Sequence, residues 1–229
     1  MPEKPNSQAY DPHIIREDFD RIARLSDGEW DHNRAYHPYL LRHIPQRIAN
    51  ALDIGCGKGE FARMLGRRAD RVEGIDLSPE MIAGAKRQTA EENIEYSAAD
   101  IRETALPANH YDCIASIATF HHLPLRETLK QLREALAPGG VLAVLDLYKA
   151  ITVWDFMLSG AAVPLNLAYS LIKTGRLPHG NTEAWRTHSA HEVILPLREI
   201  REISEDVLPG ARVKRHLLWR YSLVWVKPD

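Results

Sequence analysis

The sequence predicts an α/β fold: a doubly wound sheet of seven strands with an antiparallel last strand, an N-terminal helical arm and a helical insert after the fifth strand. From residue 51 onward, short apolar runs alternate with patterns of helical period, which is typical of a parallel sheet covered by helices on both faces. Three glycines crowd into the loop after the first apolar run. The C-terminal segment 208–228 has the pattern of two strands with a tight connection, which predicts a hairpin.

The expected elements follow one another along the chain. Strands are expected at 51–54, 71–75, 94–98, 111–117 and 140–147. Helices are expected at 58–67, 79–92 and 124–137, and after the insert at 196–207. Ser78 and Pro79 are an N-cap and first-turn pair for the second helix, and Pro138 with the two glycines after it stops the third helix.

A single domain explains this order. Residues 1–229 are expected to divide into an arm (1–45), a core (46–149), an insert that caps the substrate (150–188) and a final helix with the terminal hairpin (189–229).

The insert contains the most apolar stretch of the chain, residues 153–172. It also contains Asp155, Pro164 and Asn166, and the cost of a charge in lipid disfavours a free membrane span. A buried helix pair broken near Pro164 is expected instead. We therefore expect no membrane partner, with a homodimer through residues 150–175 as another use of this segment.

Composition narrows the class of protein. The chain has 229 residues, 45% of them apolar and 26% charged, with a net charge of −2, which is enough apolar content for a substantial core. A general nucleic-acid binder needs a basic footprint, and none is present. The two cysteines, Cys56 and Cys113, make no disulfide framework, and the N-terminus has no apolar signal core. A cytoplasmic location is expected.

The glycine loop, "ALDIGCGKGEFA" at residues 51–62, predicts a ligand at the first strand–helix turn. Gly55 and Gly57 would let the backbone amides face that ligand, beside the positive end of the next helix. Asp76 follows Gly55 by 21 residues and ends the second strand, where an acid can accept hydrogen bonds from ribose hydroxyls.

A nicotinamide or flavin enzyme would share these features so far. The loop, however, has the pattern G-C-G-K-G, not G-x-G-x-x-G, and Asp53 precedes it. A carboxylate at that place repels a pyrophosphate and suits an ammonium group. The ligand is therefore expected to have a ribose and a cationic end.

Five segments, in order, resemble the motifs of class I S-adenosylmethionine-dependent methyltransferases of the small-molecule branch. They are "LDIGCGKGEFA", "VEGIDLSPEMI", "AAD" at 98–100, "YDCIASIATFHHL" and "LREALAPGGVLAVLDLY". The resemblance covers about residues 45–148 strongly, and the terminal hairpin is similar to the antiparallel last strand of that family. It implies a Rossmann-like core that binds S-adenosylmethionine and releases S-adenosylhomocysteine.

Residue by residue, the resemblance implies a cofactor site at the strand ends. The implied contacts are Asp53, Gly55, Cys56 and Gly57 at the methionine end, Asp76 at the ribose, Leu77, Met81, Asp100 and Ile101 at the adenine, and Ile117 and Ala118 at the sulfonium. Structural roles stay open for three of them: Asp53 as a turn cap, Met81 as core and Asp100 as an N-cap.

Methyl transfer needs alignment and, for some acceptors, a base. His121 is the candidate base, since it follows the fourth strand and histidine titrates near neutral pH. Tyr36, His122, Trp154 and Trp185 are candidate substrate contacts, because aromatic side chains suit an apolar acceptor. No metal site is expected, since no H-E-x-x-H or Cys/His cluster occurs.

Missing motifs point to a small acceptor. Residues 116–120 read Ser-Ile-Ala-Thr-Phe, not the Asn/Asp-Pro-Pro-Tyr pattern of amino-methylating DNA enzymes, and 113–123 contains no acid. The expected function is methyl transfer from S-adenosylmethionine to an O or N atom of a small, fairly apolar metabolite. Two alternatives stay open: an enzyme of the same fold that uses the cofactor for cyclisation or decarboxylation, and a non-catalytic relative that binds it.

Overall fold

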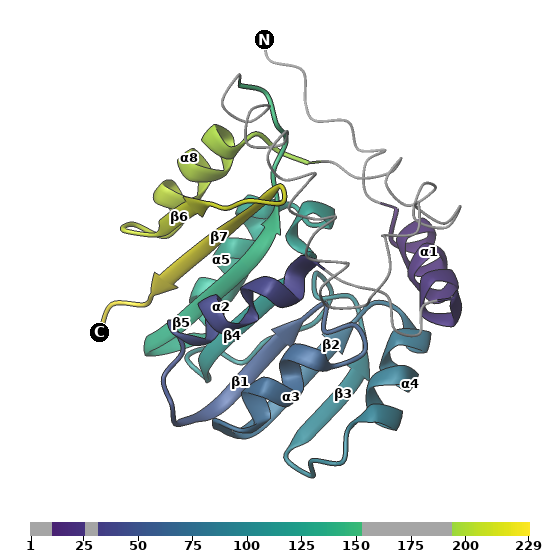
Figure 1. Ribbon diagram of the computed structural model, residues 1–229. Helices are drawn as coiled ribbons and strands as arrows, with labels where there is room; N and C mark the ends of the chain where they lie inside the picture. The colour runs from purple at the N-terminus through teal and green to yellow at the C-terminus, as the bar shows by residue number, and fades with distance from the viewer. Residues whose placement is uncertain (1–10, 26–31, 153–193) are drawn as a thin grey trace.

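The structure is a computed structural model that describes residues 11–25, 32–152 and 194–229. Its centre is a seven-stranded sheet in the order β3-β2-β1-β4-β5-β7-β6 (Figure 1). The strands are β1 (Ile48–Ile54), β2 (Ala69–Asp76), β3 (Ile94–Ala98), β4 (Tyr111–Ile117), β5 (Leu136–Leu147), β6 (Arg212–Arg215) and β7 (Arg220–Val226).

The first five strands run parallel, and β7 pairs antiparallel with both β5 and β6. The predicted fold class is confirmed. β1 and β4 pair with each other at the centre of the sheet, and the strand order runs in opposite directions from them. In such sheets the crevice at the carboxyl ends of the strands, beside this reversal, is where ligands bind.

Helices cover both faces of the sheet. They are α1 (Pro12–Leu25), α2 (His37–Leu41), α3 (Glu60–Gly66), α4 (Pro79–Gln88), α5 (Leu125–Ala135) and α8 (Leu197–Val207), with short 3-10 turns η1 (His32–Tyr36) and η2 (Phe120–His122). One apolar cluster joins α5 and α8 to the sheet, and a second joins α2, α3 and α4 to it. Because both faces are covered, residues 141–145 of β5 are a continuous apolar run, not an alternating one.

The largest differences from the expected element boundaries are at the end of α4 and at the start of β5. α4 ends at Gln88, four residues early, because Thr89 already has the extended φ and ψ of −110° and 123°. α5 ends at Ala135, and β5 begins at once with Leu136, so the strand passes through Pro138 instead of starting after it. Pro138 lies within the register shift between Leu136 and Val141, where β5 is not in regular pairing with β4.

The arm places α1 against the start of α4 (Figure 1). Ser78 caps α4 by accepting a hydrogen bond from the amide of Met81 at 3.1 Å, as the sequence predicts. The Ser78 hydroxyl in turn donates to Asp20 of α1, and Ile22 of α1 packs on Met81. The arm therefore closes over the end of β2.

The expected helical insert at 150–188 falls almost wholly outside the described residues. Within 11–25, 32–152 and 194–229, no helix has the length and apolar character needed to cross a membrane.

Candidate functional site

The expected cofactor residues meet at the carboxyl edge of the sheet. Asp53 lies near the end of β1, Asp76 ends β2 and Ile117 ends β4. The glycine loop, residues 55–59, runs from the end of β1 into α3. Residues from three separate motifs thus surround one place, beside the reversal of strand order.

Hydrogen bonds within the protein hold the glycine loop. The amides of Gly55 and Cys56 both donate to the carbonyl of Ile75, at 2.7 and 3.1 Å, and the amide of Gly57 donates to the Asp76 carboxylate at 2.8 Å. The expectation that the amides of Gly55 and Gly57 face a ligand is therefore wrong, because these donors brace the loop against β2.

Gly55 and Gly57 serve different purposes. Both have positive φ, 67° and 52°, a region that side chains disfavour. A Cβ at Gly55 would come within 1.9 Å of Thr119 Oγ1, so this glycine lets the loop pack on the segment after β4. At Gly57 no atom of the described residues would lie within 4 Å of a Cβ. The loop backbone is open to a ligand on that side.

Asp53 is a buried carboxylate, only 1% exposed. Its Oδ2 atom has no hydrogen-bond partner among the described residues. Burial and, to a smaller extent, the charge of Asp76 raise the pKa of Asp53 to about 7, although a hydrogen bond from the Ala62 amide acts to lower it. Because a buried, unpaired carboxylate oxygen is costly, a cation at this place would stabilise the ionised form.

Asp76 joins the loop to α4. It accepts hydrogen bonds from the amides of Gly57 at 2.8 Å and Ser78 at 2.9 Å, one on each oxygen. Burial raises the pKa of Asp76 to about 6, although these two hydrogen bonds act in the opposite direction. Each carboxylate oxygen has a second acceptor site, so Asp76 can still accept from a pair of hydroxyl groups.

Asp100 follows β3 and is paired with Arg102. The Arg102 guanidinium donates to both oxygens of Asp100, with its shortest contact at 2.7 Å from Nη2 to Oδ2, and its amide donates to Oδ1 at 2.9 Å. Burial acts to raise the pKa of Asp100, but the hydrogen bonds and charge of Arg102 outweigh it and hold the pKa below its usual range. Sequence reasoning missed Arg102, which stands two residues away.

The apolar candidates at the adenine end have different surroundings. Leu77 is half-buried at the edge, after β2. Met81 is 8% exposed and packs on Ile22 of α1, while Ile101 is 5% exposed and belongs to the main core. Met81 thus packs as a core residue between α1 and α4, beside the site.

The segment after β4 carries the histidine candidates. Ala118 has a φ of 53°, which turns the chain sharply out of the strand. His121 Nδ1 lies 2.6 Å from Asp146 Oδ1, and the His121 amide donates to Asp146 Oδ2 at 2.7 Å. The rings of His121 and His122 are 3.9 Å apart, and Phe19 of α1 meets His122 edge-on at 5.8 Å. His122 itself is buried, at 8% exposure.

Asp146 was not identified from the sequence. A lone acid inside the apolar run "GVLAVLDL" is the signal that could have found it, because a buried charge needs a partner.

Tyr36 lies at the junction of the arm and the terminal hairpin. Its hydroxyl donates to the carbonyl of Leu217 at 2.7 Å, and its ring lies 5.1 Å from that of His216. Burial raises the pKa of Tyr36, against the lowering effect of the Arg220 charge. Trp154 and Trp185 lie outside the described residues.

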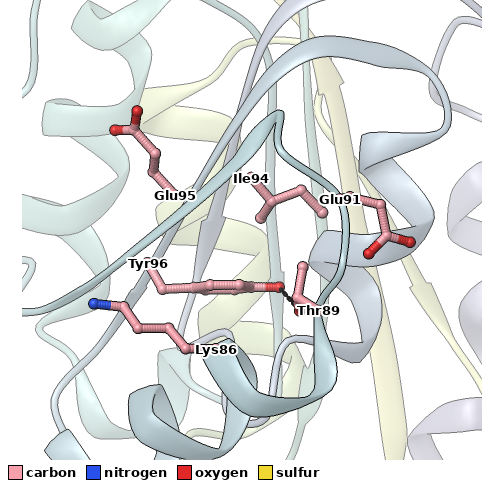
Figure 2. Close-up of a pocket in the computed structure, with 6 residues that line it drawn as sticks. All are labelled: Lys86, Thr89, Glu91, Ile94, Glu95 and Tyr96. Carbon is pink, nitrogen blue, oxygen red and sulfur yellow. Dashed lines mark hydrogen bonds between the residues drawn. The ribbon is translucent and has the colours of Figure 1, made fainter.

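A surface pocket lies elsewhere, between the end of α4 and the start of β3 (Figure 2). Its volume is about 360 Å³, and its lining is Lys86, Thr89, Glu91, Ile94, Glu95 and Tyr96. The Tyr96 hydroxyl is 3.0 Å from Thr89 Oγ1. Because it lies at the amino end of β3, this pocket is not part of the site at the carboxyl edge.

Known proteins share both the motifs and the fold. A methyltransferase domain profile matches residues 51–140. An uncharacterised methyltransferase of Mycobacterium tuberculosis (strain H37Rv) is 28% identical over 88% of this chain and 99% of its own length. The ubiquinone biosynthesis O-methyltransferase of Xanthomonas campestris pv. campestris is 24% identical over 69% of this chain and 72% of its own.

Among solved structures, the N-methyltransferase NodS of Bradyrhizobium japonicum has a TM-score of 0.63 at 19% identity, over 94% of this chain and all of its own. The sheet confirms the fold, and the profile and these matches support the resemblance to class I S-adenosylmethionine-dependent methyltransferases. The NodS structure holds S-adenosyl-l-homocysteine, and a phosphoethanolamine N-methyltransferase of Haemonchus contortus with a similar fold holds S-adenosyl-L-methionine.

Proposed function

We propose that this enzyme transfers a methyl group from S-adenosylmethionine to an O or N atom of a small, fairly apolar metabolite in the cytoplasm. The observation that carries the proposal is the pair of buried carboxylates, Asp53 and Asp76, at neighbouring strand ends. Their pKa values of about 7 and about 6 mean that the unliganded site holds negative charge at a cost. A cofactor with an ammonium and a sulfonium group offsets that cost.

The residues present fit this cofactor. Asp76 would accept the ribose hydroxyls, and the free Oδ2 of Asp53 with the open side of Gly57 would receive the methionine end. At the other end Asp100, kept ionised by Arg102, would accept from the adenine amino group. Cys56 contributes backbone only, since its thiol is buried among Gly74 and the neighbouring carboxylates.

The apolar residues complete the proposed site. Leu77, Met81 and Ile101 would line the adenine, with Met81 backed by α1, and Ile117 and Ala118 would lie beside the sulfonium. When bound, the cofactor supplies an electrophilic methyl group, and the work of these residues is to orient it and exclude water.

Acceptor selection is proposed for the arm and the insert. Tyr36, His122, Trp154 and Trp185 are the proposed contacts. The relatives named above are an O-methyltransferase and an N-methyltransferase, so both acceptor atoms occur among proteins like this one. A net charge of −2 without a basic footprint favours a small molecule over a nucleic acid as substrate.

Calorimetry tests the cofactor site. The wild-type chain should bind both S-adenosylmethionine and S-adenosylhomocysteine, and Asp76→Ala should weaken each by at least about tenfold, because hydrogen bonds to a charged group are lost. Asp112→Asn is a matched control: Asp112 also accepts from two backbone amides, of Ala49 and Asn50, but at the amino edge of the sheet. Wild-type protein that binds neither ligand would reject the proposed function.

A further inference from the structure

His121 and Asp146 form a buried pair at the carboxyl edge of the sheet. His121 lies in η2, directly after β4, and Asp146 lies one residue before the end of β5. The side chains of the two residues are 4% and 1% exposed. They are joined twice, from the ring Nδ1 at 2.6 Å and from the His121 amide at 2.7 Å. The Leu147 amide adds a third contact to Asp146, at 2.8 Å.

These contacts determine the imidazole tautomer. Two backbone N–H groups already donate to Asp146, so the carboxylate acts as an acceptor toward the ring as well. Nδ1 of His121 must then carry the hydrogen, and the neutral ring has its lone pair on Nε2. A buried acid that holds a histidine in this tautomer prepares it to take up a proton.

The pair stands where the methyl group is proposed to lie. His121 lies three positions after Ala118, and the Ala118 amide donates to the carbonyl of Leu145, next to Asp146, at 2.8 Å. β4 and β5 pair side by side at this edge (Figure 1). His121 is therefore fixed relative to the segment that we assign to the sulfonium side.

Other titratable groups also surround the pair. The His122 ring, from the same turn, lies tilted at 49° against the His121 ring. Tyr221 of β7 faces Asp146, whose charge adds to burial in raising the pKa of the Tyr221 hydroxyl. From α1, Phe19 contacts His122, and its neighbour Asp18 is buried. Asp146 is bound by both the backbone amide and the ring Nδ1 of His121, so Asp146 is the group that orients the His121 ring.

We propose that Asp146 is a positioning residue that holds His121 as a proton acceptor, and that the methyl acceptor is a hydroxyl group. The inference rests on the proposed function and names its acceptor. The hydroxyl oxygen gives its proton to Nε2 of His121, and one of its electron pairs forms the bond to the methyl carbon. The pair of the broken carbon–sulfur bond stays on sulfur, and the proton then passes from His121 to solvent.

A hydroxyl acceptor explains why a base is built here. A phenol-like hydroxyl has a pKa near 10 and is a weak nucleophile until its proton is removed. A neutral amine attacks through its lone pair and needs no base before transfer. A paired histidine and acid would therefore add little to N-methylation, whereas general-base catalysis contributes about 100- to 10,000-fold to the reaction of a hydroxyl.

The pair could instead only tie η2 to β5, and the tautomer separates the two roles. Asp146→Asn keeps an oxygen for the His121 amide but turns an NH₂ group toward Nδ1, which favours the Nε2–H tautomer. Asp112→Asn is the matched control. It removes one negative charge from a carboxylate that also accepts from two backbone amides, but at the amino edge of the sheet. His121→Gln identifies the ring signal by its loss.

Nitrogen NMR of histidine-labelled protein, with S-adenosylhomocysteine added, reads this tautomer without turnover. His121 is expected to show Nδ1–H and an unprotonated Nε2 in the wild type and in Asp112→Asn, and to gain Nε2–H in Asp146→Asn. A wild-type ring with Nε2–H, or a tautomer that Asp146→Asn leaves unchanged, would overturn the positioning role.

Turnover with catechol and with o-phenylenediamine as matched probes tests the acceptor. Methyl transfer to the oxygen of catechol is expected, with kcat reduced about 100- to 10,000-fold in His121→Gln and Asp146→Asn and with the S-adenosylhomocysteine Kd within about twofold of wild type. Preferred methylation of the diamine, or an Asp146→Asn enzyme that keeps its kcat, contradicts the inference. Loss of cofactor binding in the wild type would instead reject the proposed function, and the tautomer result would still stand by itself.

Discussion

Affinity for S-adenosylmethionine should rise with pH on the acid side of neutrality, because Asp53 must lose a proton to receive a cation. Burial raises the pKa of Asp53 in the unliganded protein to about 7, so the carboxyl group is mostly protonated at about pH 5. A bound ammonium group favours the ionised form and lowers that pKa again. Binding therefore releases a proton at low pH and releases less as the pH approaches neutrality.

The size of the effect follows from that pKa. If Asp53 stays ionised in the complex, the cofactor binds only the ionised fraction of the free protein. That fraction, and with it the affinity, falls about 50-fold, or about 2.3 kcal/mol, between about pH 7 and about pH 5. Asp76, with a pKa of about 6, acts in the same direction. The contribution of Asp53 to the slope of log affinity against pH should approach about one proton per cofactor at the acid end.

Titration calorimetry in buffers of different ionisation enthalpy measures both the affinity and the protons released. Asp53→Asn should lower the slope and the proton release by about one proton per cofactor at the acid end and leave only the share of Asp76, while Asp112→Asn should keep both shares. A wild-type affinity that is unchanged between about pH 5 and about pH 7, or the same slope in Asp53→Asn, would refute the role given to Asp53.

Four single substitutions have distinct expected results. Asp53→Asn should raise the thermal midpoint of the unliganded protein at about pH 8. A raised pKa of Asp53 contributes stability that is present below its pKa in the unfolded chain and lost as the pH rises through about 7. Scanning calorimetry that shows no gain over wild type, or the same gain at about pH 4, contradicts this expectation. Gly55→Ala should unfold at a clearly lower temperature, because its Cβ meets Thr119, whereas Gly57→Ala should stay folded and bind the cofactor more weakly; the reverse order would refute the assignment of the open side. Ser78→Ala should lower the midpoint by a few degrees, through loss of about 1 kcal/mol of N-capping, and an unchanged melting curve would exclude the cap as a stabilising contact.

Local patterns were sufficient for the fold. The parallel strands are short apolar runs that alternate with segments of helical period. The handedness of the crossover between parallel strands then leaves few possible topologies. The terminal hairpin has to pair antiparallel, which β6 and β7 do. Boundaries were less well predicted, because the end of α4 at Gln88 depends on the backbone of Thr89, and no single residue type signals that conformation.

The site was predictable where one motif determines a position. Asp53 and Asp76 could be placed at the crevice from the sequence, because Asp53 lies one residue before the end of β1 and Asp76 ends β2. The direction of the loop amides was predicted wrongly, because nothing in the loop itself reveals that Ile75 and Asp76 accept their hydrogen bonds. Those acceptors become neighbours only when β1 and β2 pair.

The partner of His121 was missed for a similar reason. Asp146 is 25 residues away in the chain and reaches His121 only through the pairing of β4 with β5. The contact of Asp20 with Ser78 spans 58 residues and depends on how α1 docks. Periodicity reports which side of an element is buried, and it does not report which buried polar groups meet.

A crystal structure of the protein with S-adenosylhomocysteine measures the central claim most directly. The ribose hydroxyls should lie about 3 Å from the Asp76 oxygens, with the amino group of the ligand near Asp53 and its backbone contact at Gly57. A ligand bound elsewhere, or one whose ribose is held by other residues while Asp76 contacts only Gly57 and Ser78, would contradict the claim.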